Sequence, residues 1–193
     1  MIAGEKGGRR IVAPEGRRTR PTAERVREAA FSMLESYLGA AGGGLAGAVV
    51  WDLFAGSGAL GIEALSRGAA HASFVDSARP AVSAVHANLA RLGYGPERAD
   101  VYCADVLRWA YGLAGQAGGG STKADLVLAD PPYGWDAWRA LLQALRPLRP
   151  LVVIESAHPV ELPEGWVALR QRGYGGSLVT LTSCEVGASL GER

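Results

Sequence analysis

The sequence predicts a Rossmann-like α/β fold: a mostly parallel sheet of seven strands with helices on both faces and a C-terminal antiparallel hairpin. Two observations lead to this prediction. Short apolar runs alternate with segments of helical periodicity from residue 49 to residue 155. A glycine-rich turn also follows the first apolar run, as in folds that bind nucleotides at the carboxyl ends of parallel strands.

Each element has its own signal in the sequence. Apolar runs predict strands at 49–53, 71–76, 99–103, 125–129 and 151–155, and the helices between them are expected at 59–67, 79–92, 106–113 and 135–145. The segments 166–174 and 178–184 flank two glycines and predict the hairpin. Upstream, apolar residues recur every three or four positions from Val26 to Leu38, which predicts an amphipathic helix with Thr22 as its N-cap.

Charge is divided unevenly along the chain. Residues 1–28 hold eight basic and four acidic side chains, whereas the remaining 165 residues hold twelve and fifteen. Such an imbalance is typical of a nucleic-acid-binding arm, but a solvated basic tail has the same composition. Charge alone leaves both interpretations open.

A glycine-rich loop joins the first predicted strand to its helix. Gly56, Gly58 and Gly61 follow Asp52 at a spacing that allows a tight turn and a close approach of ligand to backbone. Asp76 ends the second predicted strand, where a carboxylate can bind both hydroxyls of a ribose. Sites for NAD and for S-adenosylmethionine share these features, so the loop does not decide between the two cofactors.

The motif that decides is Asp130-Pro131-Pro132-Tyr133, directly after the fourth predicted strand. Two consecutive prolines fix two φ angles, so the carbonyls of Asp130 and Pro131 keep a defined direction beside a carboxylate. This rigid set of acceptors, with Tyr133 next to it, suits a planar base that bears an NH₂ group. The acceptors would bind the amine hydrogens while the base stacks on the tyrosine ring.

The chemistry of an exocyclic amine explains the need for acceptors. Its nitrogen is a poor nucleophile because the lone pair is delocalised into the ring. Hydrogen bonds from both N–H groups to fixed acceptors favour a pyramidal nitrogen, which can attack the sulfonium methyl of S-adenosylmethionine in line. Catalysis is then mainly positioning and electrostatic preorganisation, and the carboxylates of Asp52 and Asp130 suit the sulfonium charge.

Three motifs together resemble the RsmD family, bacterial class I methyltransferases that act on N2 of one guanine in 16S ribosomal RNA. They are Thr-Arg-Pro-Thr-Ala-Glu-Arg-Val-Arg-Glu at 19–28, the glycine-loop segment 52–69 and Ala-Asp-Pro-Pro-Tyr at 129–133. The resemblance covers about residues 2–181. Other amino methyltransferases share the Asp-Pro-Pro-Tyr motif, so the segment 19–28 is the feature that points to this family in particular. The loose opening at 1–8 and Trp51, where the family usually has a smaller aliphatic residue, depart from the pattern.

The resemblance implies roles for individual residues. The cofactor is expected near Asp52, Phe54, Gly56, Ser57, Gly58, Asp76, Asp105 and Thr22, with the ribose at Asp76 and the adenine at Asp105. A helix cap explains Asp105 equally well. The target guanine is expected at Asp130, Pro131, Pro132 and Tyr133, and the RNA at Arg9, Arg10, Arg17, Arg18, Arg20 and Arg25.

The implied organisation is a basic N-terminal arm plus amphipathic helix over 1–47, an S-adenosylmethionine-dependent methyltransferase domain over 48–185 and a tail over 186–193. The expected partner is 16S ribosomal RNA, alone or in an assembling or assembled small subunit. No apolar run reaches the roughly 20 residues that span a bilayer, and no signal peptide is evident, so we expect a cytoplasmic monomer that contacts no membrane. Cys103 and Cys184 have no metal-ligand spacing with the histidines, and no metal is expected.

Three alternatives stay open on the sequence. The same chemistry would serve an adenine-N6 methyltransferase of DNA or RNA, although Asp rather than Asn at position 130 resembles the guanine-directed enzymes more closely. An NAD(P)-dependent oxidoreductase would use the glycine loop but leaves the Asp-Pro-Pro-Tyr motif unexplained. A non-catalytic RNA-binding module would require that the glycine loop bind nothing.

Overall fold

The computed structural model describes residues 2–13, 21–115 and 123–184. For residues 21–23 and 113–115 it describes the backbone alone. Arg17, Arg18, Arg20 and the expected tail 186–193 therefore lie outside the described residues. Among the described helices, none has the length and apolarity needed to cross a bilayer.

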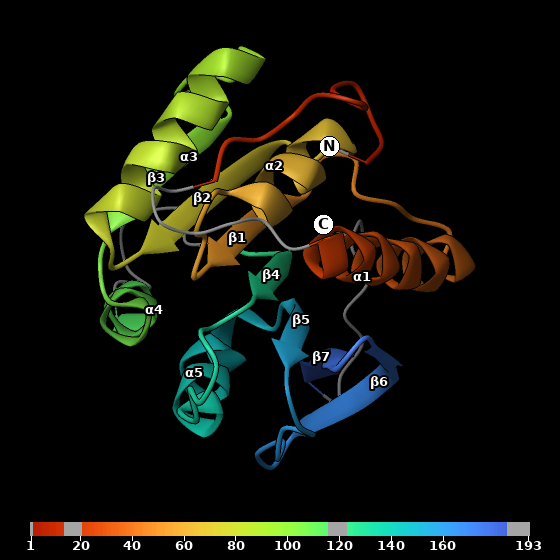
Figure 1. The fold of residues 1–193 in the computed structure, drawn as a ribbon. Helices are drawn as coiled ribbons and strands as arrows, with labels where there is room; N and C mark the ends of the chain where they lie inside the picture. Colours follow the sequence, from red (N-terminus) through yellow and green to blue (C-terminus); the bar gives the residue numbers. More distant parts are fainter. Residues whose placement is uncertain (1, 14–20, 116–122, 185–193) are drawn as a thin grey trace.

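One sheet of seven strands organises the chain, in the order β3-β2-β1-β4-β5-β7-β6 (Figure 1). The five parallel strands are β1 (Val49–Leu53), β2 (His71–Asp76), β3 (Ala99–Cys103), β4 (Leu126–Ala129) and β5 (Leu151–Ser156). The last two, β6 (Trp166–Tyr174) and β7 (Ser177–Cys184), form the antiparallel hairpin, and β7 pairs with β5. The predicted fold class is confirmed.

Helices cover both faces of the sheet because the strands are apolar on both sides. On one face, α1 (Pro21–Ala40), α2 (Ala59–Ser66) and α3 (Arg79–Leu92) pack on strand residues such as Val50, Phe74 and Leu128. On the other face, α4 (Val106–Gly115) and α5 (Trp138–Leu145) pack on Leu53 and Ile154. A 3₁₀ turn, η1 (Arg146–Leu148), follows α5.

Local hydrogen bonds explain where the element boundaries differ from the prediction. The helix expected from residue 135 begins at Trp138, because the Trp135 N–H donates to the Pro132 carbonyl at 3.1 Å and closes a turn instead. Gly134, at φ 82°, is in the left-handed conformation within that turn. The N-cap prediction for Thr22 is wrong, because α1 begins one residue earlier, at Pro21, where the fixed φ of proline suits the first turn.

The topology reverses between β1 and β4. From β1 the chain continues to β2 and β3 on one side, whereas β4 and β5 lie on the other side. In parallel α/β sheets, the crevice outside the carboxyl ends of the strands at such a reversal is the usual binding site. The sheet therefore directs attention to the segments that follow Leu53 and Ala129.

Gly61 allows α2 to pack closely on this part of the sheet. A Cβ at this position would lie 2.9 Å from Cζ of the fully buried Phe74 and 3.0 Å from Cβ of Asp52. Neither neighbour has free space to move into, since both belong to strands of the packed sheet. The third glycine of the loop is thus required by helix–strand packing rather than by its backbone conformation.

We predict that Gly61→Ala lowers the free energy of unfolding by about 1–3 kcal/mol, the usual cost of overpacking a core. Gly39→Ala is the matched control, because Gly39 lies in α1 with open space around its Cβ position. Alanine favours a helix, so this control is expected to keep or slightly raise stability. Urea unfolding measures both variants, and equal effects of the two would contradict the packing argument.

Candidate active site

The motifs singled out in the sequence meet at one edge of the sheet. Leu53 pairs with Ala129, so the glycine loop after β1 and Asp130 after β4 leave neighbouring strands at the same level. On the other side of β1, Leu53 pairs with Val75, so Asp76 at the end of β2 lies next along the edge. The two motifs that the sequence predicted to share a site are therefore neighbours.

The glycine loop turns tightly with three residues in the left-handed region. Phe54 has φ 64°, Gly56 has φ 55° and Gly58 has φ 76°. A side chain at Gly58 would also meet Ile62, Phe74 and Val85 at 3.3 Å, so both conformation and packing require glycine there. For Phe54 the conformation costs of the order of 1–3 kcal/mol, which the surrounding contacts must offset, and such strain is common where a loop meets a ligand.

Asp52 lies beneath this loop and is 1% exposed. Its carboxyl Oδ2 accepts a hydrogen bond from the Gly61 N–H at 2.8 Å. Burial raises the pKa of Asp52 from 3.8 to about 8, the Gly61 hydrogen bond opposes that rise, and Asp130 and Asp76 add to it electrostatically. In the ligand-free protein, this carboxyl is therefore largely protonated at neutral pH.

Asp76 and Asp105 hold backbone groups at the same edge. Asp76 accepts from the Gly56 N–H at 2.9 Å and from the Ala78 N–H at 2.8 Å, which ties the glycine loop to the end of β2. Asp105 is exposed and accepts from the Arg108 N–H at 2.9 Å, so it caps the start of α4. The capping interpretation of Asp105 is confirmed, whereas its contact with adenine stays a prediction.

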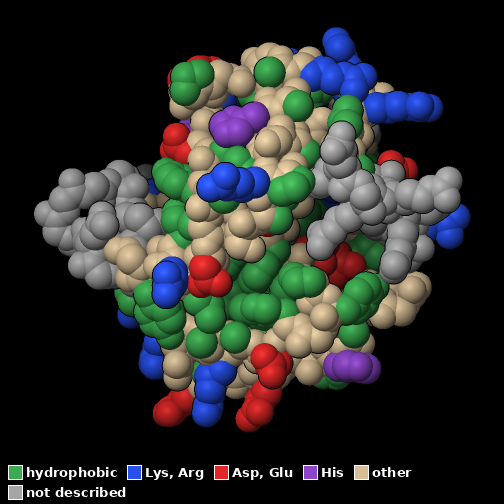
Figure 2. All heavy atoms as spheres, turned by 60° about the vertical axis from the view of Figure 1, so that its left-hand side comes forward, with side chains coloured by type: hydrophobic (Ala, Val, Ile, Leu, Met, Phe, Trp, Pro, Cys, Tyr) green, Lys and Arg blue, Asp and Glu red, His purple; other side chains and the backbone are tan. Residues whose placement is uncertain are grey.

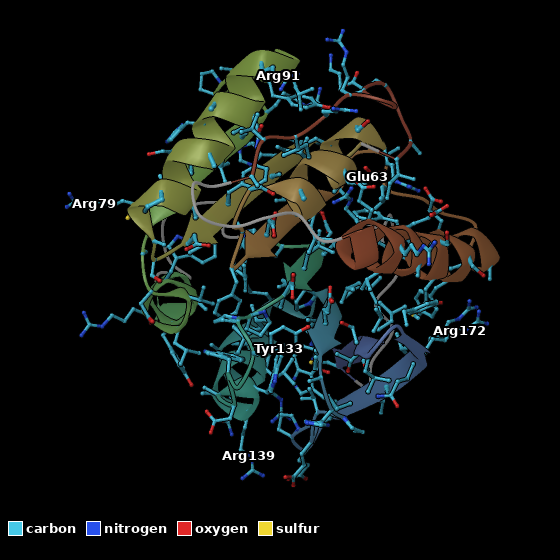
Figure 3. The ribbon with its side chains drawn as sticks, viewed as in Figure 1. Glu63, Arg79, Arg91, Tyr133, Arg139 and Arg172 are labelled. Carbon is cyan, nitrogen blue, oxygen red and sulfur yellow. The ribbon has the colours of Figure 1, made fainter. Side chains whose placement is uncertain are left out.

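The Asp130-Pro131-Pro132-Tyr133 segment continues from β4 into the turn that Trp135 closes. Asp130 is exposed at the sheet edge and close enough to Asp52 to raise its pKa. The side chain of Tyr133 is 75% exposed, and Figure 3 shows it where the chain passes from β4 toward α5. An exposed ring beside carbonyl and carboxylate acceptors is accessible to a planar base.

Aromatic side chains link this segment to the glycine loop, a feature that the sequence analysis missed. The rings of Phe54 and Trp135 meet edge-on with centroids 4.9 Å apart, and Trp135 meets Trp138 in the same way at 4.8 Å. Trp51, which departs from the family pattern, is buried and packs against Trp109 of α4, with the ring centroids 4.6 Å apart. The larger residue in β1 is thus accommodated by an aromatic partner on the facing helix.

Figure 2 turns the side of the molecule with α3 and α4 forward and shows hydrophobic side chains gathered across its middle. Exposed aromatic residues in the described part of the chain include Tyr102 and Tyr111 besides Tyr133. Tyr102, on the edge strand β3, packs against Trp109 with ring centroids 5.4 Å apart. Aromatic side chains are therefore exposed on β3, on α4 and in the segment after β4.

The described part of the basic arm does not project into solvent but lies against α2. The Glu63 carboxylate, which is fully buried, accepts from the N–H groups of Ile2 and Ala3 at 2.8 and 3.0 Å. The Ser66 hydroxyl accepts from the Lys6 N–H at 2.9 Å and donates to the Ala3 carbonyl at 2.7 Å. Backbone groups of the arm thus supply hydrogen-bond partners to polar side chains that are buried on α2.

Asn88 of α3 holds the other end of the arm. Its Oδ1 accepts from the Val12 N–H, and its Nδ2 donates to the Val12 carbonyl and to the Ser57 carbonyl, all at 2.9 Å. Asn88 is 1% exposed and follows Ala81, Ala84 and Val85 on the apolar face of α3. A polar residue at a core position of an amphipathic helix was the available sequence signal for this contact.

The expected RNA-binding residues that the structure describes are on the surface. Arg9, Arg10 and Arg25 are exposed, whereas the side chain of Thr22 lies outside the described residues.

Figure 3 shows Glu63 on α2 near the start of the arm, on the side where α1 lies. There Arg67 joins Glu63 to Glu35 of α1 through bonds of 2.8 and 2.7 Å.

We predict that Asp52→Asn removes a pH dependence from stability. The folded state keeps a proton on Asp52 up to about pH 8, whereas the unfolded chain releases it near pH 3.8. The free energy of unfolding of the wild type therefore falls as pH rises between these values, by at most about 1.4 kcal/mol per pH unit. Asparagine can still accept from Gly61 and carries no charge, so the variant gains stability over the wild type toward pH 8.

Urea unfolding between pH 5 and pH 9 measures this difference. Asp136→Asn, at an exposed aspartate in the turn before α5, controls for the loss of one negative charge. A constant stability difference between wild type and Asp52→Asn across this range would mean that Asp52 is ionised in the folded protein.

Comparison with known proteins agrees with this geometry. Residues 1–183 match the family model described as conserved hypothetical protein 95. A Bacillus subtilis protein, YlbH, whose name provisionally assigns it as an rRNA methyltransferase, is 38% identical over 183 residues, which are 91% of this chain and 93% of that protein. Ribosomal RNA small subunit methyltransferase D of Escherichia coli is 36% identical over 133 residues, which are 69% of this chain and 59% of that enzyme.

Among solved structures, the yhhF protein of Escherichia coli, provisionally titled a methyltransferase, superposes with a TM-score of 0.77 at 29% identity. The superposition covers 97% of this chain and 98% of that one, so it includes the N-terminal segment as well as the sheet. The matched family model, the related sequences and the shared fold agree with the three motifs. The chain belongs to the RsmD family of methyltransferases.

Proposed function

We propose that this chain methylates the exocyclic N2 amine of a specific guanine in 16S ribosomal RNA, with S-adenosylmethionine as methyl donor. The observation that carries the proposal is the pairing of β1 with β4, because it makes the glycine loop and the Asp130 segment neighbours. A glycine loop that binds a cofactor occurs in many classes of enzyme. Such a loop next to rigid acceptors for an NH₂ group favours methylation of an amine.

The residues at the edge fit S-adenosylmethionine in their chemistry. The bound cofactor would supply a methyl group activated by a cationic sulfonium. Burial raises the pKa of Asp52, and a nearby cation would lower it again because the cation stabilises the ionised carboxylate. Each carboxylate oxygen of Asp76 accepts one backbone N–H group and has a further lone pair that would suit a ribose hydroxyl. Asp105 at the start of α4 would suit the adenine amine.

The acceptors after β4 would act on the base. Asp130 and the carbonyl of Pro131 would accept from the two N–H groups of the amine, and the exposed ring of Tyr133 would stack on the guanine. Their task is to fix the amine lone pair in one direction. After methyl transfer the nitrogen is cationic and holds its protons weakly, so the loss of one proton needs no strong base. A fixed backbone suits this task because no reorganisation is needed during the reaction.

The basic arm would bind the RNA. A base in a structured RNA must leave its stack to enter such a site, which costs a few kcal/mol, and phosphate contacts of the arm would offset part of that cost. Arg9 and Arg10 are exposed on the docked part of the arm, and Arg25 is exposed on α1. We propose a basic arm with the amphipathic helix over 1–47, the methyltransferase domain over 48–185 and a tail over 186–193, in a monomer of the cytoplasm that acts on the small subunit or its RNA.

The direct test is nucleoside analysis of RNA methylated by the purified protein. We expect N2-methylguanosine in digests of 16S ribosomal RNA or small subunits taken from cells that lack the gene. Asp130→Ala is expected to lower the yield about 100-fold or more, because it removes a fixed acceptor, while calorimetry still detects S-adenosylmethionine binding. Asp136→Ala, at a neighbouring exposed aspartate, is the control and is expected to keep wild-type activity.

Other products would decide between the alternatives. N6-methyladenosine would identify an adenine-directed enzyme with the same chemistry. Binding of NAD in place of S-adenosylmethionine would point to an oxidoreductase, and RNA binding without either cofactor would point to a non-catalytic module. Wild-type activity of Asp130→Ala would exclude the acceptor role.

Neutralising Arg17, Arg18 and Arg20 together with glutamine is expected to weaken RNA binding more than cofactor binding. Each lost phosphate contact lowers the magnitude of the slope of log affinity against log salt by about 0.7–0.9, so the three changes together are expected to lower it by about 2–3. The control triple variant changes Arg91, Arg139 and Arg172, which are exposed on α3, α5 and β6 (Figure 3). RNA affinity equal to that of the wild type at matched salt would exclude the arm as the binding segment.

A further inference from the structure

Asn88 bonds to two segments that belong to different parts of the proposed site. It holds both backbone polar groups of Val12 in the arm, and it holds the carbonyl of Ser57 in the glycine loop. Arg9 and Arg10, which are exposed basic residues of the arm, stand only three and two positions before Val12. One buried amide therefore connects the segment expected at the RNA to the segment expected at the cofactor.

The bond to Ser57 is one of several that fix the glycine loop. The Gly56 N–H is held by Asp76, and the Gly58 N–H donates to the Ala55 carbonyl at 2.7 Å. The first of these bonds ends on the last residue of β2, and the second ends within the loop itself. The bond from Asn88 to Ser57 ends on a side chain that is shared with the arm.

The burial of Asn88 makes this sharing strict. Its side chain is 1% exposed and its Nδ2 uses both hydrogens, one for each segment. Release of Val12 would remove two of the three hydrogen bonds that orient the Asn88 amide, and the loss of these bonds favours reorientation of the amide. Reorientation of the amide in turn removes the constraint on the Ser57 carbonyl. The position of the arm and the conformation of the loop are thus energetically linked.

We propose that Asn88 is a positioning residue that couples docking of the N-terminal arm to the conformation of the glycine loop, and thereby couples RNA engagement to cofactor affinity. The second half of this statement rests on the proposed function, because it takes the loop to hold S-adenosylmethionine and the arm to contact RNA. The first half concerns the protein alone. By linkage, an arm that is correctly docked raises cofactor affinity by the same factor as bound cofactor stabilises arm docking.

Val12→Pro tests the coupling from the arm side. Proline removes the N–H group that donates to Asn88 but leaves Asn88 and Ser57 unchanged, and the exposed Val12 side chain contributes little packing. We expect hydrogen exchange of the amides at 56–62 to accelerate in the ligand-free protein. We also expect the affinity for S-adenosylmethionine, measured by calorimetry, to fall about 5-fold or more.

Two controls separate this route from a general loss of structure. Val12→Ala shortens the same side chain but keeps the N–H group, so wild-type exchange and affinity are expected. Ser66→Ala loosens the arm at Ala3 and Lys6, where no bond to the glycine loop exists among the described residues, and it is expected to leave both readouts unchanged. In an Asn88→Ala background, Val12→Pro is expected to have no further effect on either readout, because the connection is already broken.

The outcomes separate the coupling from the proposed function. Equal effects of Val12→Pro and Ser66→Ala, or full additivity of Val12→Pro with Asn88→Ala, would overturn the coupling. If Asn88→Ala does not fold, the contrast between Val12→Pro, Val12→Ala and Ser66→Ala still decides. A wild-type protein that fails to bind S-adenosylmethionine would overturn the proposed function, and loop exchange would then decide the coupling by itself.

Discussion

The pairing of β1 with β4 is the constraint on which the rest of the site depends. Because the two strands are parallel neighbours, the chain leaves both at one edge and then diverges, toward α2 after Leu53 and toward α5 after Ala129. The divergence opens the edge between the glycine loop and Asp130. A slip of one residue in register would turn Asp52 to the other face of the sheet and remove it from the N–H group of Gly61.

Local sequence signals gave the strands, the helices and their order, and the structure confirms them. The apolar runs are unambiguous because a parallel strand covered on both faces needs no polar residue. The start of α5 was misplaced since the turn at Trp135 depends on a hydrogen bond to Pro132, which no periodicity reveals. For the site, the adjacency of the two motifs followed from their places after parallel strands. The assignment of single residues to cofactor or RNA stays a prediction.

The contacts of the arm were beyond the reach of local patterns for a physical reason. They join backbone groups of one segment to side chains of helices 60 to 76 positions away, and a backbone group leaves no trace in the sequence. Only the partner side chains carry a signal, as Glu63 and Asn88 do by being polar within buried helix faces. Such residues indicate that something polar must cover them, without indicating which segment does so.

Several features of the edge lower the stability of the ligand-free protein. Asp52 is buried near two other carboxylates, and Phe54 adopts a backbone conformation that is unfavourable for a residue with a side chain. Proteins retain such features where binding or catalysis needs them, and other parts of the fold offset their cost. A cation at the edge would relieve the first of them, so ligand binding and folding are expected to support each other here.

The order of synthesis has a consequence for the arm. Residues 2–12 leave the ribosome before Glu63, Ser66 and Asn88, which hold them and are made 60 to 76 residues later. Until α2 and α3 have formed, the nascent N-terminus has no surface on which to dock. Contacts of such large sequence separation form late and slow the folding of a domain. The growing chain therefore carries its basic segment unattached for much of translation.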